Sequence, residues 1–236
     1  MKSTIFAILI WICSMPMFET LAQTSNEEKP YVYQLSKEEE QIAFQKPPRE
    51  CRKQAKRLYK DGYKEVPGDP ILDRQQYYVN ILKIKKANDG KPKFLISSYR
   101  ADAEDFIAAR KFAEHSVKMS LAGYISTTVV DIIKTSVDVN NLSKTELNSL
   151  SKMASQSKSL IAQEVGNLLI PFVATKELPN GFSIWVTAAV DREEIYAIAK
   201  KVMKNEMLKE NLKMEKEVDS AFEIMKNQKL SGGEIE

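Results

Sequence analysis

Residues 101–137 decide the fold of this chain, and they read ADAEDFIAARKFAEHSVKMSLAGYISTTVVDIIKTSV. Apolar side chains recur along them at intervals of three and four residues, which is the spacing of one face of an α-helix. They are Ala103, Phe106, Ile107, Ala113, Val117, Leu121, Ile125 and Ile132. Residues 126–137 contain many β-branched side chains, which weaken a helix, but a strand there would place Asp131 on its apolar face. The pattern therefore predicts one long helix over residues 101–137.

The clearest β pattern lies at residues 168–175 and 182–190, where apolar side chains alternate between two faces. The sequence Pro-Asn-Gly at 179–181 separates the two segments and is typical of a turn, so together they predict a β-hairpin. Pro171 cannot donate a hydrogen bond to a neighbouring strand, which indicates a sheet edge or a bulge at that position. Trp185 falls on the face opposite its apolar neighbours, and we expect it to cover the outer side of the sheet.

These segments predict an α+β fold in which a small sheet, including the C-terminal β-hairpin, packs against the long alanine-rich helix. The alanines keep one side of that helix slim, as close packing on a sheet requires. A short strand over residues 93–99 is expected to lead into the helix. Further helices are expected to flank this core at residues 48–61, 71–86, 144–165 and 192–227. Asp191 is expected to cap the last of them, and an ion pair made by Arg192 is expected to be structural.

The last two flanking helices differ from the others in their surfaces. Ser143 followed by Glu146 forms a capping box, but the helix that it starts is rich in serine and sparsely apolar. We therefore expect that helix to be half exposed and mobile. The final helix becomes highly charged, which predicts a projecting arm at residues 205–236 that ends in a disordered tail at 231–236. Such an arm would offer a contact for homo-oligomerisation.

The N-terminus has the features of a signal peptide for export. Lys2 precedes an apolar run at residues 5–12 that is too short to cross a bilayer, and small residues stand at the −3 and −1 positions of a cleavage site after Ala22. Cleavage there is the favoured interpretation. Lipid attachment at Cys13 and an uncleaved anchor remain as alternatives, although Ile12 is larger than the residue that a lipid-attachment cysteine requires before it.

The chain is thus expected to comprise a signal peptide (1–22), a flexible leader (23–46), an α+β envelope domain (47–204) and the charged helical arm with its tail (205–236). The leader is polar and acidic and ends in two prolines. No segment after the signal peptide is long and apolar enough to predict a transmembrane helix. The mature chain would keep one cysteine, Cys51, and so could form no internal disulfide.

The overall charge argues against a nucleic-acid partner. The chain has 35 basic and 32 acidic residues, a formal net charge of +3, which gives no general attraction to polyanions. Basic residues do cluster at 49–60 and 83–93, but apart from Tyr59 no aromatic side chains are interleaved with the basic ones to stack on bases. We interpret both clusters as solvated helix faces.

No combination of residues predicts a catalytic, cofactor-binding or metal site, and the common catalytic and nucleotide-binding motifs do not occur. The single histidine, His115, has ordinary helix neighbours. Cys51 lies among basic residues that would lower a thiol pKa, but with no histidine nearby we interpret it as a partly buried helix residue. Asp102, Glu104 and Asp105 would lie at the start of the long helix, where the macrodipole favours negative charge.

Part of the chain resembles a known family. The segment at 103–125, AEDFIAARKFAEHSVKMSLAGYI, resembles the A-R-x-x-A…L-A-x-x-I helix of the twenty-kilodalton envelope lipoprotein family. A similar helix occurs in the N-terminal domain of flagellar assembly protein T. In those proteins a hairpin follows that ends in a segment like WVTAAVDR, residues 185–192 here. The resemblance covers residues 94–200 and implies an α+β domain of the cell envelope, with no catalytic residues to carry over. This chain lacks the family's lipid-attachment motif, so the resemblance does not imply a lipid anchor.

The leading hypothesis is a non-enzymatic protein exported to the periplasm or the outer membrane, which acts through contacts with an envelope protein partner. The surfaces expected to make those contacts are the 143–165 helix and the 205–236 arm. Two alternatives remain open. One is a binding module for a small envelope ligand, held in an apolar pocket between helix and sheet; the other is a hydrolase with an unfamiliar site.

Overall fold

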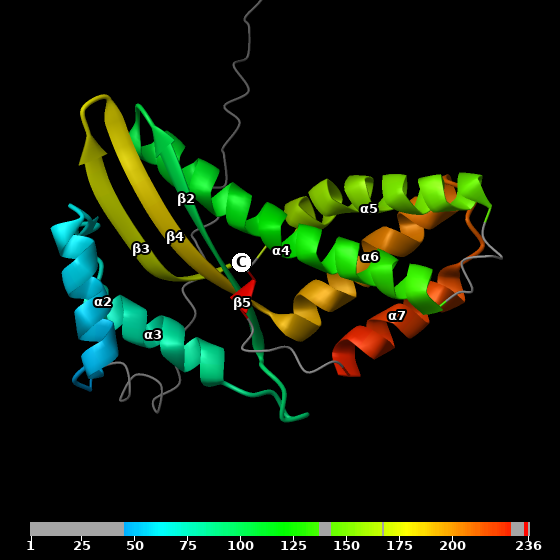
Figure 1. Ribbon diagram of the computed structural model, residues 1–236, viewed down its shortest axis with the longest axis horizontal. Helices are drawn as coiled ribbons and strands as arrows, with labels where there is room; N and C mark the ends of the chain where they lie inside the picture. Colours follow the sequence, from blue (N-terminus) through cyan, green and yellow to red (C-terminus); the bar gives the residue numbers. More distant parts are fainter. Residues whose placement is uncertain (1–44, 137–142, 167, 228–233, 236) are drawn as a thin grey trace, which may run out of the picture.

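The structure is a computed structural model that describes residues 45–136, 143–166, 168–227 and 234–235 (Figure 1). Its helices are α2 (Arg49–Lys60), α3 (Leu72–Ile84), α4 (Phe106–Ser136), α5 (Lys144–Glu164), α6 (Arg192–Lys209) and α7 (Glu215–Asn227). Its strands are β1 (Lys64–Glu65), β2 (Phe94–Ala103), β3 (Leu169–Leu178), β4 (Gly181–Asp191) and β5 (Glu234–Ile235). The predicted α+β class is confirmed. Within the described residues, no helix is both long and apolar enough to cross a membrane.

The strands form one sheet in the order β1-β3-β4-β2-β5. Neighbours from β1 to β2 run antiparallel, and β5 lies parallel to β2. All ten residues of β2 pair with β4, from Phe94 opposite Asp191 to Ala103 opposite Phe182. Strand β4 therefore lies at the centre of the sheet, with β3 on one side and β2 on the other.

The register of β3 against β4 shifts between Leu169 and Phe172, so the prediction of an irregularity at Pro171 is confirmed. Gln75 of α3 compensates for part of the disturbed ladder, because its side-chain oxygen accepts a hydrogen bond from the backbone N–H of Val173 at 2.7 Å. Its amide nitrogen donates to the carbonyl of Pro70 at 2.6 Å. A buried polar side chain needs such partners, and Gln75 thus fastens α3 to the irregular part of the strand.

Helix α4 lies across one face of the sheet, against β2 and β4, and α5, α6 and α7 pack around its other sides (Figure 1). Its small residues Ala109 and Ala113 are fully buried, as the slim-sided helix predicted from the sequence requires. Val129 and Ile133, in the β-branched half, are also buried. That half is helical because burial in tertiary packing outweighs the weak helix propensity of its residues.

The opposite face of the sheet is covered by α2 and α3 (Figure 1). Their apolar residues meet Phe172 and Ala174 of β3 in a second, smaller core. Trp185 of β4 packs against this second core, whereas its neighbours Ile184 and Val186 belong to the core beneath α4. The prediction that Trp185 covers the outer side of the sheet is confirmed.

The predicted start of the long helix is wrong. Residues 101–103 belong to β2, where they pair with β4 on one side, and the helix begins at Phe106. Asp105 explains the boundary, because its carboxylate accepts a hydrogen bond from the backbone N–H of Ala108 at 2.8 Å, as an N-terminal cap does. Asp102 therefore lies on a strand and not in the first turn of the helix.

The predicted continuous helix from 192 to 227 is also wrong. Helix α6 ends at Lys209, and Asn211 adopts a left-handed conformation (φ 54°) that asparagine tolerates well. The chain then turns back, so that α7 packs against α4 and α6. The apolar side of α7 is buried in the main core: Val218, Ala221, Phe222 and Met225. Up to Asn227, where the described part of this region is continuous, the predicted projecting arm does not form. A free C-terminal helix was the basis for the predicted homo-oligomerisation, and α7 is not free.

Two further predictions concern the ends of elements. The capping box at Ser143 is confirmed, because its hydroxyl accepts from the backbone N–H of Glu146 at 3.2 Å and the Glu146 carboxylate accepts from the N–H of Ser143 at 2.8 Å. The apolar side of α5 is buried, with Leu150, Met153 and Ile161 fully enclosed. The predicted disordered tail is wrong at residues 234–235, which form β5; the rest of that tail lies outside the described residues.

Candidate functional site

The sequence singled out few chemically reactive residues, and the structure does not bring them together. The predicted signal peptide, with Cys13 and Ala22, lies outside the described residues. His115 is exposed on α4. Within the part of the chain that the structure describes, no group of three or more histidine, cysteine, aspartate or glutamate residues could hold a metal ion.

Cys51 is fully buried on α2, as a structural residue would be. Burial raises the pKa of its thiol above the ordinary value, although a hydrogen bond from the Asn80 side chain at 3.2 Å acts in the opposite direction. The neighbouring cations expected to activate it point to solvent, because Arg52 and Lys53 are exposed. A protonated, enclosed thiol is a poor nucleophile.

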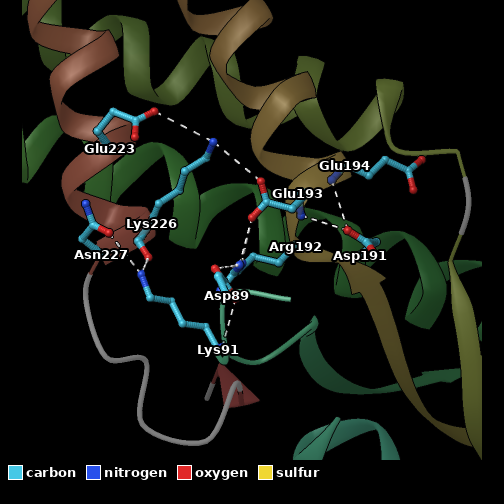
Figure 2. Close-up of polar contacts among 9 residues, drawn as sticks. All are labelled: Asp89, Lys91, Asp191, Arg192, Glu193, Glu194, Glu223, Lys226 and Asn227. Carbon is cyan, nitrogen blue, oxygen red and sulfur yellow. Dashed lines mark hydrogen bonds and ion pairs between the residues drawn. The ribbon is translucent and has the colours of Figure 1, made fainter. Parts of the chain in front are cut away.

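A dense group of charges joins the start of α6 to the end of α7 and to the loop before β2 (Figure 2). Arg192 is 2% exposed, and its guanidinium pairs with Asp89 at 2.5 Å and with Glu193 at 2.9 Å. Lys226 of α7 lies 3.6 Å from the same Glu193. Lys91 donates hydrogen bonds to the carbonyl of Lys226 and to the Asn227 side chain (Figure 2).

This charge cluster is explained by structure alone. Its cations are matched by carboxylates or carbonyls at hydrogen-bonding or ion-pairing distance, so they have little capacity left for a ligand. Asp191 caps α6 as predicted, accepting from the backbone N–H groups of Glu193 and Glu194. The cluster fastens the C-terminal end of α7 to the start of α6 and to the loop before β2.

A pocket of about 430 Å³ lies on the sheet face opposite α4, where α2 and α3 meet residues of β2 and β4. The lining residues from α2 and its C-cap are three or four positions apart and therefore lie on one side of the helix. They are Gln54, Arg57, Leu58 and Asp61. The contribution of α3 has similar spacing: Gln76, Val79 and Lys83. The pocket is therefore lined mainly by polar side chains, not by the apolar ones that the ligand-module hypothesis anticipated.

The strands supply the floor of the pocket through Ser98, Trp185 and Thr187. The hydroxyls of Ser98 and Thr187 lie 2.8 Å apart and hydrogen-bond across β2 and β4. The Trp185 ring makes edge-to-face contacts with Tyr63 (6.1 Å between centroids) and Phe172 (5.8 Å). These contacts fix the indole, so the floor is rigid.

The guanidinium of Arg100 lies 5.8 Å from the Trp185 ring and donates to the hydroxyl of Tyr63 at 3.1 Å. That hydroxyl in turn lies 3.2 Å from the hydroxyl of Ser183. This network, on the same sheet face as the pocket, adds a cation to the charges around it. Chemically the pocket offers hydrogen-bond donors, hydrogen-bond acceptors and positive charge; its lining contains no cysteine or histidine that would serve as nucleophile or base.

A second exposed feature is the outer edge of β2. Beyond Ile96 and Ser97, which pair with β5, no strand among the described residues adjoins residues 98–103 on that side. Tyr99 on the strand and Phe112 on α4 stand beside this edge, 40% and 56% exposed, with their rings in edge-to-face contact at 6.3 Å. We call residues 98–103 with Phe112 the β2 edge surface.

Neither feature was predicted. Arg57 and Lys83 belong to the two basic clusters that we interpreted as solvated helix faces, and the sequence gives no sign that the chain brings them to one pocket. The edge was missed because the predicted strand stopped at residue 99. Comparison with family models, with curated proteins and with solved structures found no match to this chain.

Proposed function

We propose that this chain is a non-enzymatic protein of the cell envelope that acts through protein–protein contacts. The proposal is supported by the signal-peptide pattern of residues 1–22 and by the family resemblance of residues 94–200. The observation that carries the contact itself is the β2 edge surface, because an unpaired strand edge is a template for pairing with another chain. The partner at this surface is a second copy of the chain.

Charge complementarity favours a second copy. If two β2 edges pair antiparallel about Ala101, Arg100 of each copy lies opposite Asp102 of the other, and both side chains are exposed. Arg100 gives one donor to the Tyr63 hydroxyl, and the guanidinium keeps further N–H donors for the carboxylate. Tyr99 then lies opposite Ala103. Residues 98–103 contain no lysine or proline, the residues with which proteins commonly block an edge.

The contact is expected to be weak. Six residues on each side bury less than the roughly 1,200–2,000 Å² of a stable interface, and exposed ion pairs add about 1 kcal/mol or less each. We therefore place the expected dissociation constant in the weak range, at about 10–100 μM. Such a constant suits reversible assembly at the concentrations of a crowded compartment.

Charge reversal tests the pairing. Arg100→Asp and Asp102→Arg each place like charges opposite each other, so each variant alone is expected to be monomeric in sedimentation velocity where the natural chain dimerises. An equimolar mixture places aspartates opposite arginines at both positions and is expected to dimerise again. Glu177→Arg on β3, an exposed reversal away from the edge, is the control and leaves dimerisation unchanged. A natural chain that stays monomeric up to about 500 μM, well above the weakest dissociation constant expected, or a mixture that does not recover, contradicts the proposal.

Export is tested separately. The full chain, expressed with a C-terminal epitope in a Gram-negative host, is expected in the periplasmic or membrane fraction with residues 1–22 removed. Deletion of residues 1–22 is expected to retain it in the cytoplasm. Recovery of the full chain from the cytoplasm with an intact N-terminus would contradict an envelope location.

The second candidate function is a binding module for a small ligand. The pocket between α2, α3 and the sheet favours it, since a volume of about 430 Å³ lies within the range of ordinary ligand sites.

A further inference from the structure

We propose that the pocket lined by Arg57, Lys83 and Trp185 binds a small hydroxylated carboxylate of the sugar-acid class. This inference concerns a different surface from the β2 edge and stands independently of it. Its argument rests on three properties of the lining: its charge, its mixture of hydrogen-bond donors and acceptors, and the rigidity of its floor.

The charge of the lining selects an anion. Arg57 and Lys83 contribute two positive charges from two helices, and Asp61 is the only carboxylate of the lining. Among the described residues, no ion pair engages Arg57. A guanidinium has a planar fork of donors that matches a carboxylate in two parallel hydrogen bonds. A carboxylate bound near the end of α2 could therefore form an ion pair and two parallel hydrogen bonds with the Arg57 guanidinium.

The remaining polar groups select a ligand that also carries hydroxyls. Gln54 and Gln76 each present an amide that both donates and accepts, and Asp61 only accepts. A bare sulfate offers acceptors alone, and a phosphate adds few hydroxyl donors, so neither matches the accepting groups as a polyhydroxylated ligand does. Hydroxyls donate and accept at once, so a polyhydroxylated body satisfies amides and carboxylate together. An acidic sugar combines this body with the carboxylate that Arg57 requires.

The floor is organised before any ligand arrives. Trp185 is held between Tyr63 and Phe172 by edge-to-face contacts, and Ser98 is bonded to Thr187. Binding to a rigid surface avoids the loss of side-chain freedom that otherwise opposes association. The indole, with Leu58 and Val79, adds an apolar wall suited to the C–H groups of a sugar ring.

Trp185 reports on its own pocket. The chain has two tryptophans, Trp11 and Trp185, so in a full-length Trp11→Phe variant, excited at a wavelength that tyrosine does not absorb, the tryptophan fluorescence comes from the pocket alone. This variant is titrated with D-glucuronate, D-galacturonate and N-acetylmuramate, and with glucose, galactose and N-acetylglucosamine as neutral counterparts. We expect a saturable change with at least one acid, in the millimolar range or tighter, and binding of its neutral counterpart at least about tenfold weaker.

Arg57→Ala is expected to weaken binding of that acid by about tenfold or more, since it removes the bidentate partner. Arg52→Ala is the matched control, because Arg52 is exposed on the same helix outside the pocket, and it leaves binding unchanged. Unfolding midpoints of both variants equal to that of the parent show that the loss is local.

Three results would overturn the proposal. One is the lack of a saturable response to all three acids; another is a response that Arg57→Ala leaves intact. The third is acetate or inorganic phosphate binding as tightly as the sugar acid, which would reduce the pocket to a general anion site. Repeating the titration with Asp102→Arg separates this inference from the proposed dimer, because a monomeric variant that binds the acid supports the pocket alone.

Discussion

Replacing Phe222 by alanine is expected to lower the free energy of unfolding by about 3–5 kcal/mol, the range for loss of a buried aromatic ring. Phe222 lies on α7 and is 1% exposed. Its ring meets that of Tyr196 edge-to-face, with centroids 6.1 Å apart, in the core that α4, α6 and α7 share. The truncation removes apolar contacts and leaves a cavity that helices on three sides cannot easily fill. Urea unfolding followed by circular dichroism measures the difference.

Ile224→Ala is the matched control for this change. Ile224 stands two residues further along the same helix but is 38% exposed, so its truncation is expected to lower stability by about 1 kcal/mol or less. The pair of variants distinguishes a packed α7 from a projecting arm. In an arm both substitutions would have equally small effects, and a Phe222→Ala loss of less than about 1 kcal/mol would therefore contradict the packing of α7.

The C-terminal helices show why sequence periodicity failed in this region. The apolar residues of α7 recur at helical spacing but are outnumbered by charges, which is also the pattern of a solvated arm. What decides between the two is whether another part of the chain offers an unfilled apolar surface, and α4 offers one on the side away from the sheet. Residues Leu212 and Met214, between the two helices, are buried as well, so the turn itself is fixed by packing. Such a long-range contact has no local signature.

Where a pattern is local, the sequence was sufficient. The capping box at Ser143, the irregularity at Pro171 and the position of Trp185 each depend on a few neighbouring residues, and the structure bears them out. The start of α4 required one more fact, the length of β4. Because β4 has eleven residues, β2 extends to Ala103 to pair with it, and the helix cannot begin until the strand ends.

The candidate pocket could not be predicted for the same reason. Arg57 and Lys83 are 26 positions apart by their numbers, and each is typical of an exposed helix position. Their common location depends on how α2 and α3 lie over β3, which leaves the surface of β4 and β2 beside them uncovered. Only Trp185 gave a hint, since a tryptophan on the outer face of a sheet needs some cover.

Replacing Gly181 by alanine is the second change for which we expect a large effect, a loss of about 2–5 kcal/mol, because two penalties combine. Gly181 follows the turn between β3 and β4 with φ of +140°, a conformation that residues with a side chain rarely adopt. A Cβ atom there would lie 2.2 Å from the carbonyl oxygen of Ala103 and 2.7 Å from Cα of Glu104. Both are backbone atoms of the corner where β2 leads into α4, so they cannot rotate away. The midpoint of thermal unfolding measures the loss.

Gly68 separates the two penalties. It also has a positive φ, +94°, but a Cβ there would meet nothing within 4 Å. Gly68→Ala therefore carries the backbone penalty alone and is expected to cost about 1–2 kcal/mol. The excess loss in Gly181→Ala then measures the contact between the β3–β4 turn and the β2–α4 corner. If the two variants lost equal stability, the close approach between the β3–β4 turn and the β2–α4 corner would be contradicted.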